Sequence, residues 1–325
     1  MRFGIIGTNY ISDRFMAALP FTESTAVAVY SRQEETGRAF AEKHGIPLVF
    51  TDLAAFLSSD AFDAVYVASP NCCHKEQSIA SLCAGKHVLC EKPIAPSLRE
   101  YQEMKAQADR MGLVLVEAMR PVFDRNWAII QENVSKLGAL RKVHLDYCQY
   151  SGRYDAFLSG TVLNAFNPAL SNAALLDIGV YPIAVAAMLF GAPKTVESTV
   201  LRLSNGFEGG GTILLGYDDF EVTVTYSKVC DSVAPSFILG ERGGITVDKI
   251  SEPSEAFLKI RGEKTLPIAL EKTPAPDNMF EEICAFSALV SQGKGSSTAD
   301  ISRTTLYIMD KVREQNGVIF PSDTI

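Results

Sequence analysis

The amino-acid sequence predicts an α/β protein in which an N-terminal Rossmann domain, with a doubly wound parallel sheet, precedes an α+β domain with a large, open, mainly antiparallel sheet. Three observations support this. The 325 residues exceed what one hydrophobic core usually supports. From residue 2 to about 118, short apolar strands alternate with helical segments, as in βαβ units. Beyond residue 119, consecutive strands are separated by Gly and Asp turns, which favours antiparallel pairing. We therefore expect domains at 1–118 and 119–325.

The elements of the first domain follow from its apolar runs and their breakers. Strands are expected at 3–6, 26–30, 47–50, 64–67, 87–89 and 113–116. Helices are expected at 11–19, 34–43, 73–83 and 98–110. The last of these helices has Ser97 and Glu100 at capping-box spacing at its start and Gly112 placed to end it.

The second domain changes rhythm. It begins with a helix at 124–135, a strand at 141–150 and a helix from about 174 to 189. Strands are then expected at 195–203, 211–217, 220–226, 236–239 and 244–247. Two helices close the chain at 278–290 and about 299–315, and Asp277 is placed to cap the first of them.

Composition excludes two classes of partner. The formal net charge of −8 and the absence of a Lys and Arg stripe argue against a nucleic-acid partner. The longest apolar stretch, residues 180–192, contains Pro182 and is shorter than the roughly 20 residues of a membrane span. The first residues lack the apolar region of a signal peptide, so no membrane association is expected.

The cysteines and histidines indicate a reducing compartment and no metal. Seven cysteines at irregular spacing stand mostly in apolar stretches. A cytoplasmic location is therefore predicted. Three histidines, His44, His87 and His144, share no metal-ligand spacing with cysteines or carboxylates, so no metal site is expected.

The first strand leads into a candidate dinucleotide-binding turn. Residues 7–12 read Gly-Thr-Asn-Tyr-Ile-Ser, which keeps only the first glycine of G-x-G-x-x-G. Asn9 tolerates left-handed backbone angles and Ser12 is small, so we expect the turn to bind a pyrophosphate at the helix N-terminus. An ordinary βα turn is the alternative. The expected cofactor contacts here are Gly7, Thr8, Asn9, Tyr10 and Ile11.

The end of the second strand carries the residues that would read the ribose. Ser31 and Arg32 stand where an Asp or Glu would accept the 2′-hydroxyl of NAD. Donors and positive charge suit a 2′-phosphate instead, so NADP(H) is favoured and NAD(H) is the alternative. The alternative is that Arg32 is a solvated surface residue, neutralised by Glu34 and Glu35, that does not contact the cofactor.

Three sequence segments carry a family resemblance. Residues 62–71 read Phe-Asp-Ala-Val-Tyr-Val-Ala-Ser-Pro-Asn and are followed by His74, and residues 84–93 read Ala-Gly-Lys-His-Val-Leu-Cys-Glu-Lys-Pro. Residues 175–182 read Leu-Leu-Asp-Ile-Gly-Val-Tyr-Pro. Together they closely resemble the glucose-fructose oxidoreductase / inositol dehydrogenase (Gfo/Idh/MocA) family, over nearly the whole chain.

The resemblance implies a site. It implies cofactor contacts by Ser69, Pro70, Asn71, His74, Glu91 and Lys92. It also implies a catalytic set of Lys92, Asp177 and Tyr181. Tyr181 stands where many members have His; in this it resembles the Tyr-containing members, which include the dimeric dihydrodiol dehydrogenases.

The chemistry of these residue types agrees with that implication. Lys92 lies just beyond an apolar strand, at the edge where α/β sheets bind ligands, and its ammonium can hydrogen-bond a substrate oxygen. Asp177 and Tyr181 are four residues apart and would project from one face of a helix, one to orient a hydroxyl and one to relay its proton. The alternative is that the three residues have only structural roles: Lys92 as a surface lysine, Asp177 as a helix N-cap and Tyr181 as a core residue.

Further candidates surround this set. His74 either lies beside the site or only bonds backbone. Glu117 and Arg120, just past the strand ending at Val116, either contact nicotinamide or substrate, or form a structural salt bridge. Arg153, Tyr154 and Asn164, in the loop before Asp177, are candidate sugar contacts together with Lys92, Asp177 and Tyr181.

The sequence therefore predicts an NAD(P)-dependent oxidoreductase that transfers a hydride between a nicotinamide cofactor and a hydroxyl or keto carbon of a small sugar, polyol or diol. One alternative is a non-catalytic regulator that senses a nucleotide or sugar on the same fold. Another is a different reductase chemistry, on a tetrapyrrole or dihydrodiol. By analogy with the family, a homodimer through the C-terminal sheet is expected.

Overall fold

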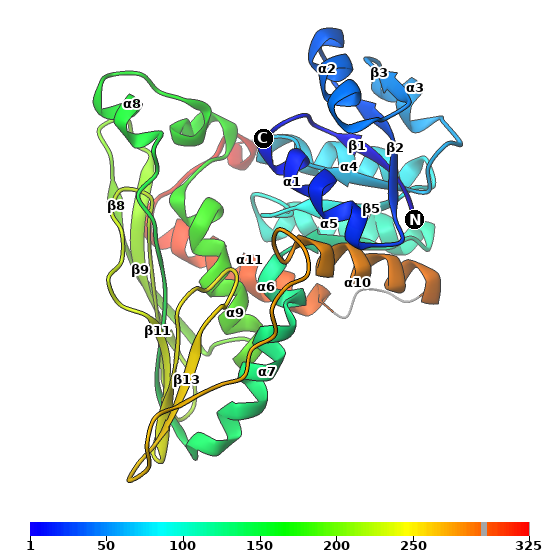
Figure 1. Cartoon of the computed structure of the whole chain (residues 1–325). Helices are drawn as coiled ribbons and strands as arrows, with labels where there is room; N and C mark the ends of the chain where they lie inside the picture. The colour runs from blue at the N-terminus through cyan, green and yellow to red at the C-terminus, as the bar shows by residue number, and fades with distance from the viewer. Residues whose placement is uncertain (294–297, 325) are drawn as a thin grey trace. The chain divides into compact units, whose positions relative to one another are not determined.

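The computed structural model describes residues 1–293 and 298–324 and consists of two compact units (Figure 1). The first unit contains Met1–Phe123 and Thr273–Asp300, and the second contains Asp124–Lys272 and Ile301–Ile325. The expected division, with 119–325 as one continuous domain, does not include the return of residues 273–300 to the first unit.

The first unit is built on a six-stranded parallel sheet of order β3-β2-β1-β4-β5-β6. Its strands are β1 (Arg2–Ile6), β2 (Thr25–Tyr30), β3 (Leu48–Phe50), β4 (Ala64–Val67), β5 (His87–Glu91) and β6 (Leu115–Ala118). The strand order reverses between β1 and β4, which makes the carboxyl ends of these strands the ligand-binding edge of a doubly wound sheet. The predicted fold class of this domain is confirmed.

Helices alternate with these strands. They are α1 (Tyr10–Ala18), α2 (Glu34–His44), α3 (Leu53–Leu57), α4 (His74–Cys83), α5 (Leu98–Met111) and α6 (Arg120–Phe123), with short 3-10 turns η1 (Leu19–Phe21) and η2 (Asn71–Cys73). The Ser97 hydroxyl accepts a hydrogen bond from the Glu100 N–H, and Gly112 ends α5 with φ of 65°. Both capping predictions hold. Helix α3 was not predicted, because its five residues are too few to show a helical period.

Helix α10 (Met279–Gln292) joins the first unit from far along the chain. Its Ile283 and Phe286 are fully buried in the core that also contains Phe3. The guanidinium Nε of Arg14 in α1 donates to the Asp277 carboxylate at 2.7 Å. The same carboxylate accepts from the Met279 N–H at 2.9 Å, which is the predicted cap.

The second unit is built on an eight-stranded sheet of order β14-β13-β12-β11-β7-β10-β9-β8. Its strands are β7 (Leu140–Cys148), β8 (Thr195–Arg202), β9 (Glu208–Gly216), β10 (Glu221–Ser227), β11 (Ser236–Gly240), β12 (Gly243–Val247), β13 (Ala256–Ile260) and β14 (Leu266–Pro267). Only the β7–β10 pair is parallel, so the predicted large, mainly antiparallel sheet is confirmed. The last two strands were not predicted.

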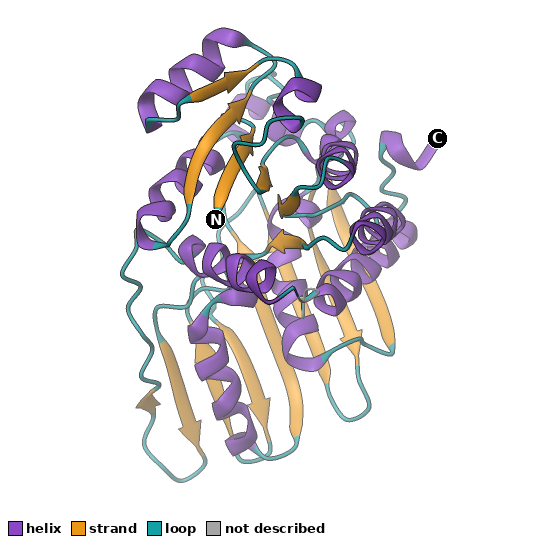
Figure 2. Ribbon diagram, turned by 90° about the vertical axis from the view of Figure 1, so that its right-hand side faces the viewer, coloured by secondary structure: helices purple, strands orange, loops and turns teal. Residues whose placement is uncertain are grey.

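The two faces of this sheet differ. One buried row, from β11 through β7, β10 and β9 to β8, packs beneath helices; it consists of Ile238, Val143, Val222, Leu215 and Val196. The helices and turns of this unit are α7 (Arg125–Val134), η3 (Ser135–Leu137), α8 (Tyr154–Leu158), η4 (Asn164–Phe166), η5 (Pro168–Leu170), η6 (Leu175–Gly179), α9 (Val180–Phe190), α11 (Ala299–Asn316) and η7 (Pro321–Thr324). Helices α7, α9 and α11 lie on the same side of the sheet (Figures 1 and 2).

The helix expected at 174–189 is two structures. Residues Leu175–Gly179 form a π-helical turn, and Val180–Phe190 form the regular α-helix α9. Every residue from Val180 to Ala187 is buried. The longest apolar stretch of the sequence is therefore accounted for by a buried helix. None of the helices in the ranges 1–293 and 298–324 is long and apolar enough to cross a bilayer.

Candidate active site

The candidate residues belong to both units. Lys92 and the nucleotide turn lie in the first unit, and Asp177 and Tyr181 lie in the second.

Gly7 occupies a position that only glycine can fill. Its φ is 106°, and a Cβ there would stand 2.5 Å from the Ala68 carbonyl oxygen at the end of β4. The backbone of the β1–α1 turn therefore passes close to the neighbouring strand at the switch point of the sheet. This close approach is what the first glycine of a dinucleotide-binding turn provides.

Asn9 replaces the second glycine by a different means from the one expected. Its backbone is extended, with φ of −91° and ψ of 179°, so left-handed tolerance is not used. Instead its Oδ1 accepts from the Ile11 and Ser12 N–H groups, at 3.0 and 3.3 Å, as the N-cap of α1. Its Nδ2 donates to the Ala68 carbonyl at 2.7 Å. The side chain thus holds the turn in shape where the motif has lost glycine.

The neighbouring positions of the turn divide by exposure. Ser12 is fully buried, so its small side chain serves the packing of α1 on the sheet. Tyr10, the first residue of α1, is 70% exposed, and Thr8 is half-buried. Ile11 belongs to the apolar side of α1 that packs against the core of the unit. Backbone and side chains of this turn together form the ligand-facing end of the helix.

Ser31 and Arg32 follow β2 at the same edge of the sheet but behave differently. The buried Ser31 hydroxyl is hydrogen-bonded to the Thr36 hydroxyl at 2.7 Å. Arg32 is exposed. Glu34 pairs with Arg38 at 2.6 Å, so that acid is engaged elsewhere. The Arg32 charge acts on the Cys73 thiol in the loop after β4, whose pKa burial raises to about 11. By its position just after β2, the exposed Arg32 stands at the carboxyl edge of the parallel sheet.

His74 ties together two of the motif segments. Its Nδ1 and Nε2 lie 2.9 Å from the carbonyl oxygens of Pro93 and Ser69. The ring is fully buried, and burial lowers its pKa. The loop containing Ser69, Pro70 and Asn71 is thereby fixed to the segment after β5. Of the two roles expected for His74, these contacts correspond to the one in which the ring bonds backbone.

Glu91 ends β5, and Lys92 follows it directly. The Tyr66 hydroxyl donates to Glu91 Oε1 at 2.6 Å, and Glu91 Oε2 accepts from the Lys92 N–H at 3.1 Å. Burial raises the pKa of the Glu91 carboxyl, opposed by the Tyr66 hydroxyl and the Lys92 charge. The Lys92–Pro93 peptide is cis. Lys92 is half-buried and directly follows β5, at the carboxyl edge of the sheet.

Glu117 and Arg120 are buried supports of the same edge. Strand β6 continues to Ala118, so Glu117 lies inside the strand, and not past its end as expected. Its Oε1 accepts from the Ile94 N–H at 3.0 Å, next to Pro93. Arg120 Nη1 donates to Asn278 Oδ1 at 3.1 Å. These contacts hold the Lys92 segment and helix α10 in place.

Asp177 lies in the π-helical turn, and not at a helix N-cap. The N-cap reading is therefore wrong. Inserted π turns are frequent at functional sites because they displace a side chain from the regular helical register. The Asp177 side chain is 44% exposed, and its Oδ2 lies 2.6 Å from Lys228 Nζ.

Tyr181 lies one turn later, in α9, and is 7% exposed. Its ring packs edge-on against Tyr147 of β7, with centroids 5.4 Å apart. Asp177 and Tyr181 therefore lie on consecutive turns of one helical segment, but the π turn departs from the regular α-helical spacing on which the expectation of a shared face was based.

The candidate sugar contacts lie in the irregular segment before Asp177. Arg153 and Asn164 are exposed. The Tyr154 ring stacks on Phe166, with centroids 5.6 Å apart. The structure thus supports this loop with an aromatic cluster that begins at Tyr154.

Sequence reasoning missed three buried polar residues beside Asp177. They are Glu208, Tyr226 and Lys228, in or just after β9 and β10. Glu208 accepts from the Leu175 N–H at 2.8 Å, at the start of the π turn. Burial raises the pKa of Glu208 to about 7. A glutamate and a lysine at strand ends read as surface residues, so only their burial could have marked them.

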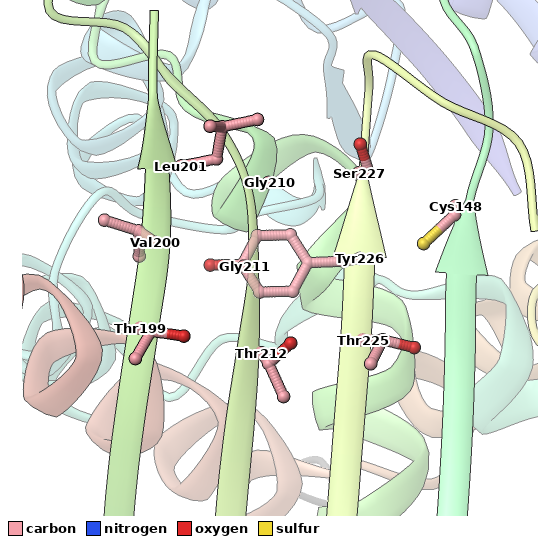
Figure 3. Close-up of a pocket in the computed structure, with 10 residues that line it drawn as sticks. All are labelled: Cys148, Thr199, Val200, Leu201, Gly210, Gly211, Thr212, Thr225, Tyr226 and Ser227. Carbon is pink, nitrogen blue, oxygen red and sulfur yellow. The ribbon is translucent and has the colours of Figure 1, made fainter.

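A hollow of about 410 Å³ lies on β7 to β10, but it contains none of the candidate catalytic residues. Figure 3 shows its lining side chains, which include Cys148, Leu201 and Thr225. Gly210, without a side chain, contributes to it. The register of strands β7 to β10 places most of the residues that line this hollow on the sheet face opposite α9. Asp177 and Tyr181 belong to η6 and α9, on the other face of the sheet. Among the described residues, no three His, Cys, Asp or Glu side chains gather as a metal site would require.

The chain is similar to known proteins over its whole length. Residues 1–119 match the profile of the oxidoreductase family with an NAD-binding Rossmann fold, and residues 129–246 match the GFO/IDH/MocA C-terminal domain. It is 46% identical to the scyllo-inositol 2-dehydrogenase (NADP(+)) IolU of Bacillus subtilis, over 99% of both chains. It is 28% identical to human trans-1,2-dihydrobenzene-1,2-diol dehydrogenase, over 99% of both chains.

A solved structure shares the fold. KijD10, a 3-ketoreductase from Actinomadura kijaniata in complex with NADP and TDP-benzene, superposes with a TM-score of 0.84 over 97% of both chains, at 24% identity. The fold that carries the Gly7 turn, the segment ending in Lys92 and the Asp177 turn is therefore one that a solved structure shares. The predicted family and enzyme class are confirmed: this chain is a member of the Gfo/Idh/MocA family of oxidoreductases, with an NAD(P)-binding Rossmann domain.

Proposed function

We propose that this enzyme is an NADP-dependent dehydrogenase that oxidises a ring hydroxyl of a cyclic polyol or sugar, or reduces the corresponding ketone. The observation that carries this proposal is the 46% identity, over 99% of both chains, with an NADP-dependent scyllo-inositol dehydrogenase. The exposed Arg32 beside the nucleotide edge supports NADP over NAD, since a guanidinium can pair with a 2′-phosphate.

The turn at Gly7 fits the cofactor. Its glycine-only close approach leaves backbone N–H groups at the start of α1 facing the ligand edge, where a pyrophosphate would bind. When bound, the cofactor would supply a nicotinamide ring that can accept a hydride from the carbinol carbon. Thr8, Tyr10 and the Ser69–Asn71 loop would border it.

Three side chains then handle the substrate. Lys92 hydrogen-bonds the reacting oxygen and stabilises the negative charge on it. Tyr181 relays the hydroxyl proton: its phenolic oxygen accepts this proton and passes its own phenolic proton on to solvent as the hydride leaves, so that a ketone remains. Asp177 accepts a hydrogen bond from a neighbouring hydroxyl and fixes the ring. Arg153, Tyr154 and Asn164 contact the remaining hydroxyls.

The test is a turnover assay of the purified chain on inositols, aldoses and a trans-dihydrodiol, each with NADP⁺ and with NAD⁺. We expect inositol oxidation with NADP⁺ and far slower rates with NAD⁺. Nucleotide binding without turnover on any substrate would favour the sensing regulator instead. Turnover restricted to the dihydrodiol would move the substrate class and leave the enzyme class intact.

We also propose a homodimer that forms through the face of the eight-stranded sheet opposite α9. Exposed apolar side chains support it: Leu201, Leu214, Leu239 and Phe257 alternate with the buried row and are 38% to 52% exposed. Light scattering on Leu214→Lys should give a smaller mass than on wild type. The control, Ile319→Lys, changes an exposed residue outside the sheet and should keep the wild-type mass.

A cytoplasmic location completes the proposal. None of the seven cysteines forms a disulfide in the structure, and unpaired thiols are typical of proteins in reducing compartments. Fractionation of cells that express the chain should recover it with the cytoplasmic marker. Recovery from an oxidising compartment with its thiols paired would contradict this.

A further inference from the structure

A buried lysine faces the candidate substrate-binding carboxylate. Lys228 follows β10 directly and its side chain is 5% exposed, whereas that of Asp177 is 44% exposed. The Lys228 Nζ lies 2.6 Å from Asp177 Oδ2. A cation removed from water in this way is costly unless an opposite charge and hydrogen bonds compensate it. Asp177 supplies that charge.

The remaining contacts of the ammonium fix its direction. Nζ donates to the Ala165 carbonyl at 3.0 Å. It also lies 4.8 Å from the centroid of the Phe166 ring and 5.6 Å from that of Phe207, within cation–π range. The backbone of Lys228 is held too, because its N–H donates to the Gly209 carbonyl at 2.9 Å. The side chain therefore has one well-defined position.

These contacts connect two parts of the candidate site. Ala165 and Phe166 belong to η4, which begins at Asn164, and Phe166 stacks on Tyr154. The Lys228 carbonyl accepts from the Ser151 N–H at 2.9 Å, at the start of the same loop. One residue thus contacts the loop of the candidate sugar contacts at both ends and Asp177 as well.

We infer that Lys228 is a positioning residue, which keeps the Asp177 carboxylate ionised and oriented and couples it to the loop 151–166. The inference rests on the proposed function, in which Asp177 accepts a hydrogen bond from a substrate hydroxyl. The Asp177 side chain is 44% exposed, so the carboxylate that Lys228 contacts also remains accessible from solvent, as binding of a substrate hydroxyl requires.

Other titratable groups of the second unit face the π turn. From β9 comes Glu208, from β10 Tyr226, from β7 Tyr147 and from α9 Tyr181. Burial raises the pKa of Glu208 to about 7, so this group also changes charge near neutrality. The charge of Lys228 lowers the pKa of Glu208 in part. Glu208→Gln must therefore serve as the background in which the effect of Lys228 on Asp177 is measured.

The experiment compares Lys228→Met with Lys228→Arg, in wild type and in Glu208→Gln. In Lys228→Met, kcat/KM for the polyol should fall about 10-fold to 100-fold, as for a misplaced contact group. The acidic limb of its pH profile should move up by about one pH unit, because loss of the cation favours the protonated carboxyl. Lys228→Arg should restore the acidic limb, and NADPH affinity should stay within about twofold in every variant.

The matched control is Lys194→Met, which removes an exposed lysine that pairs with Asp218 on the same unit. It should leave both kcat/KM and the pH profile at wild-type values. An active Lys228→Met with the wild-type acidic limb would overturn the inference, and so would an equal fall in the Asp177→Asn background, since Lys228 acts through Asp177.

Folding provides a second readout that is independent of turnover. If Lys228→Met unfolds, the double variant with Asp177→Asn should recover thermal stability, because both charges leave together. Equal instability of single and double variants would contradict the pairing. If wild type turns over no substrate, the proposed function fails, whereas the stability cycle still measures the Lys228–Asp177 coupling.

Discussion

The ring of Tyr226 lies against the backbone of Gly179, so that a Cβ at residue 179 would stand 3.0 Å from two of the ring carbons. Gly179 ends the π turn that carries Asp177. We predict that Gly179→Ala pushes this turn off β10 and lowers kcat about tenfold, equivalent to about 1.4 kcal/mol of activation free energy. Steady-state kinetics and NADPH titration would show the loss in kcat with unchanged cofactor affinity.

Gly152→Ala is the control for that substitution. A Cβ at Gly152 meets nothing within 4 Å, and its φ is not positive. Its kinetics should match those of wild type. Unchanged turnover in Gly179→Ala would mean that the π turn does not set the position of Asp177.

Lys92→Ala should abolish measurable turnover, by a factor of about 10² to 10⁴, because the reacting oxygen loses its cationic partner. Cofactor affinity should remain nearly intact, since the Gly7 turn does not depend on this side chain. Nucleotide fluorescence titration and the melting temperature separate the two effects. A variant that fails to fold, or that keeps its turnover, would count against Lys92 as the catalytic lysine.

Arg32→Ala should weaken NADPH binding about tenfold and leave NADH binding unchanged, because a charge-assisted hydrogen bond to the 2′-phosphate is lost. Fluorescence titration with both nucleotides measures this. Arg38→Ala is the control, since that exposed guanidinium pairs with Glu34. Equal weakening of both nucleotides would assign Arg32 to the pyrophosphate or to the fold instead.

The pH dependence of stability should reveal Glu208. Burial raises its pKa from 4.5 to about 7 in the folded chain, so the folded state holds this proton more tightly than the unfolded state. Its contribution is fully present below about pH 4.5 and is lost as the pH rises to about 7. The difference corresponds to about 3 kcal/mol.

Glu208→Gln removes this proton and still offers an oxygen to the Leu175 N–H. Thermal unfolding from about pH 4.5 to 8 should show a shallower decline in melting temperature than in wild type. Glu197→Gln, an exposed change on the adjacent strand β8, should keep the wild-type slope. The same slope in Glu208→Gln would refute the buried proton.

The sequence predicted the fold because its periodic signals are strong, and it missed what depends on distant contacts. Alternating apolar strands and helices identified the parallel sheet, and Gly7 marked the turn after β1 whose backbone passes close to Ala68. A π turn has the same composition as an α-helix, so the changed register at Asp177 was not readable. The left-handed role expected of Asn9 was wrong because its amide reaches Ala68, a residue far along the chain.

Lys228 illustrates the same limit within the candidate site. In the sequence it is a lysine just after an apolar strand, which is typical of a solvated strand end. Its burial arises from Ala165, Phe166 and Phe207, which approach it only in the folded sheet. The motif residues could be named from the sequence, but the residues that hold them could not.

The return of α10 to the first unit gives the protein the architecture of an insertion. The chain passes between units after Phe123, after Lys272 and after Asp300. A fragment cut at residue 118 would lose Ile283 and Phe286 from the core around Phe3 and leave that apolar surface open to water. Exchange of substrate specificity between relatives is therefore best made by transplanting residues 124–272 together with residues 301–325, which complete the second unit, with α10 left in its native unit.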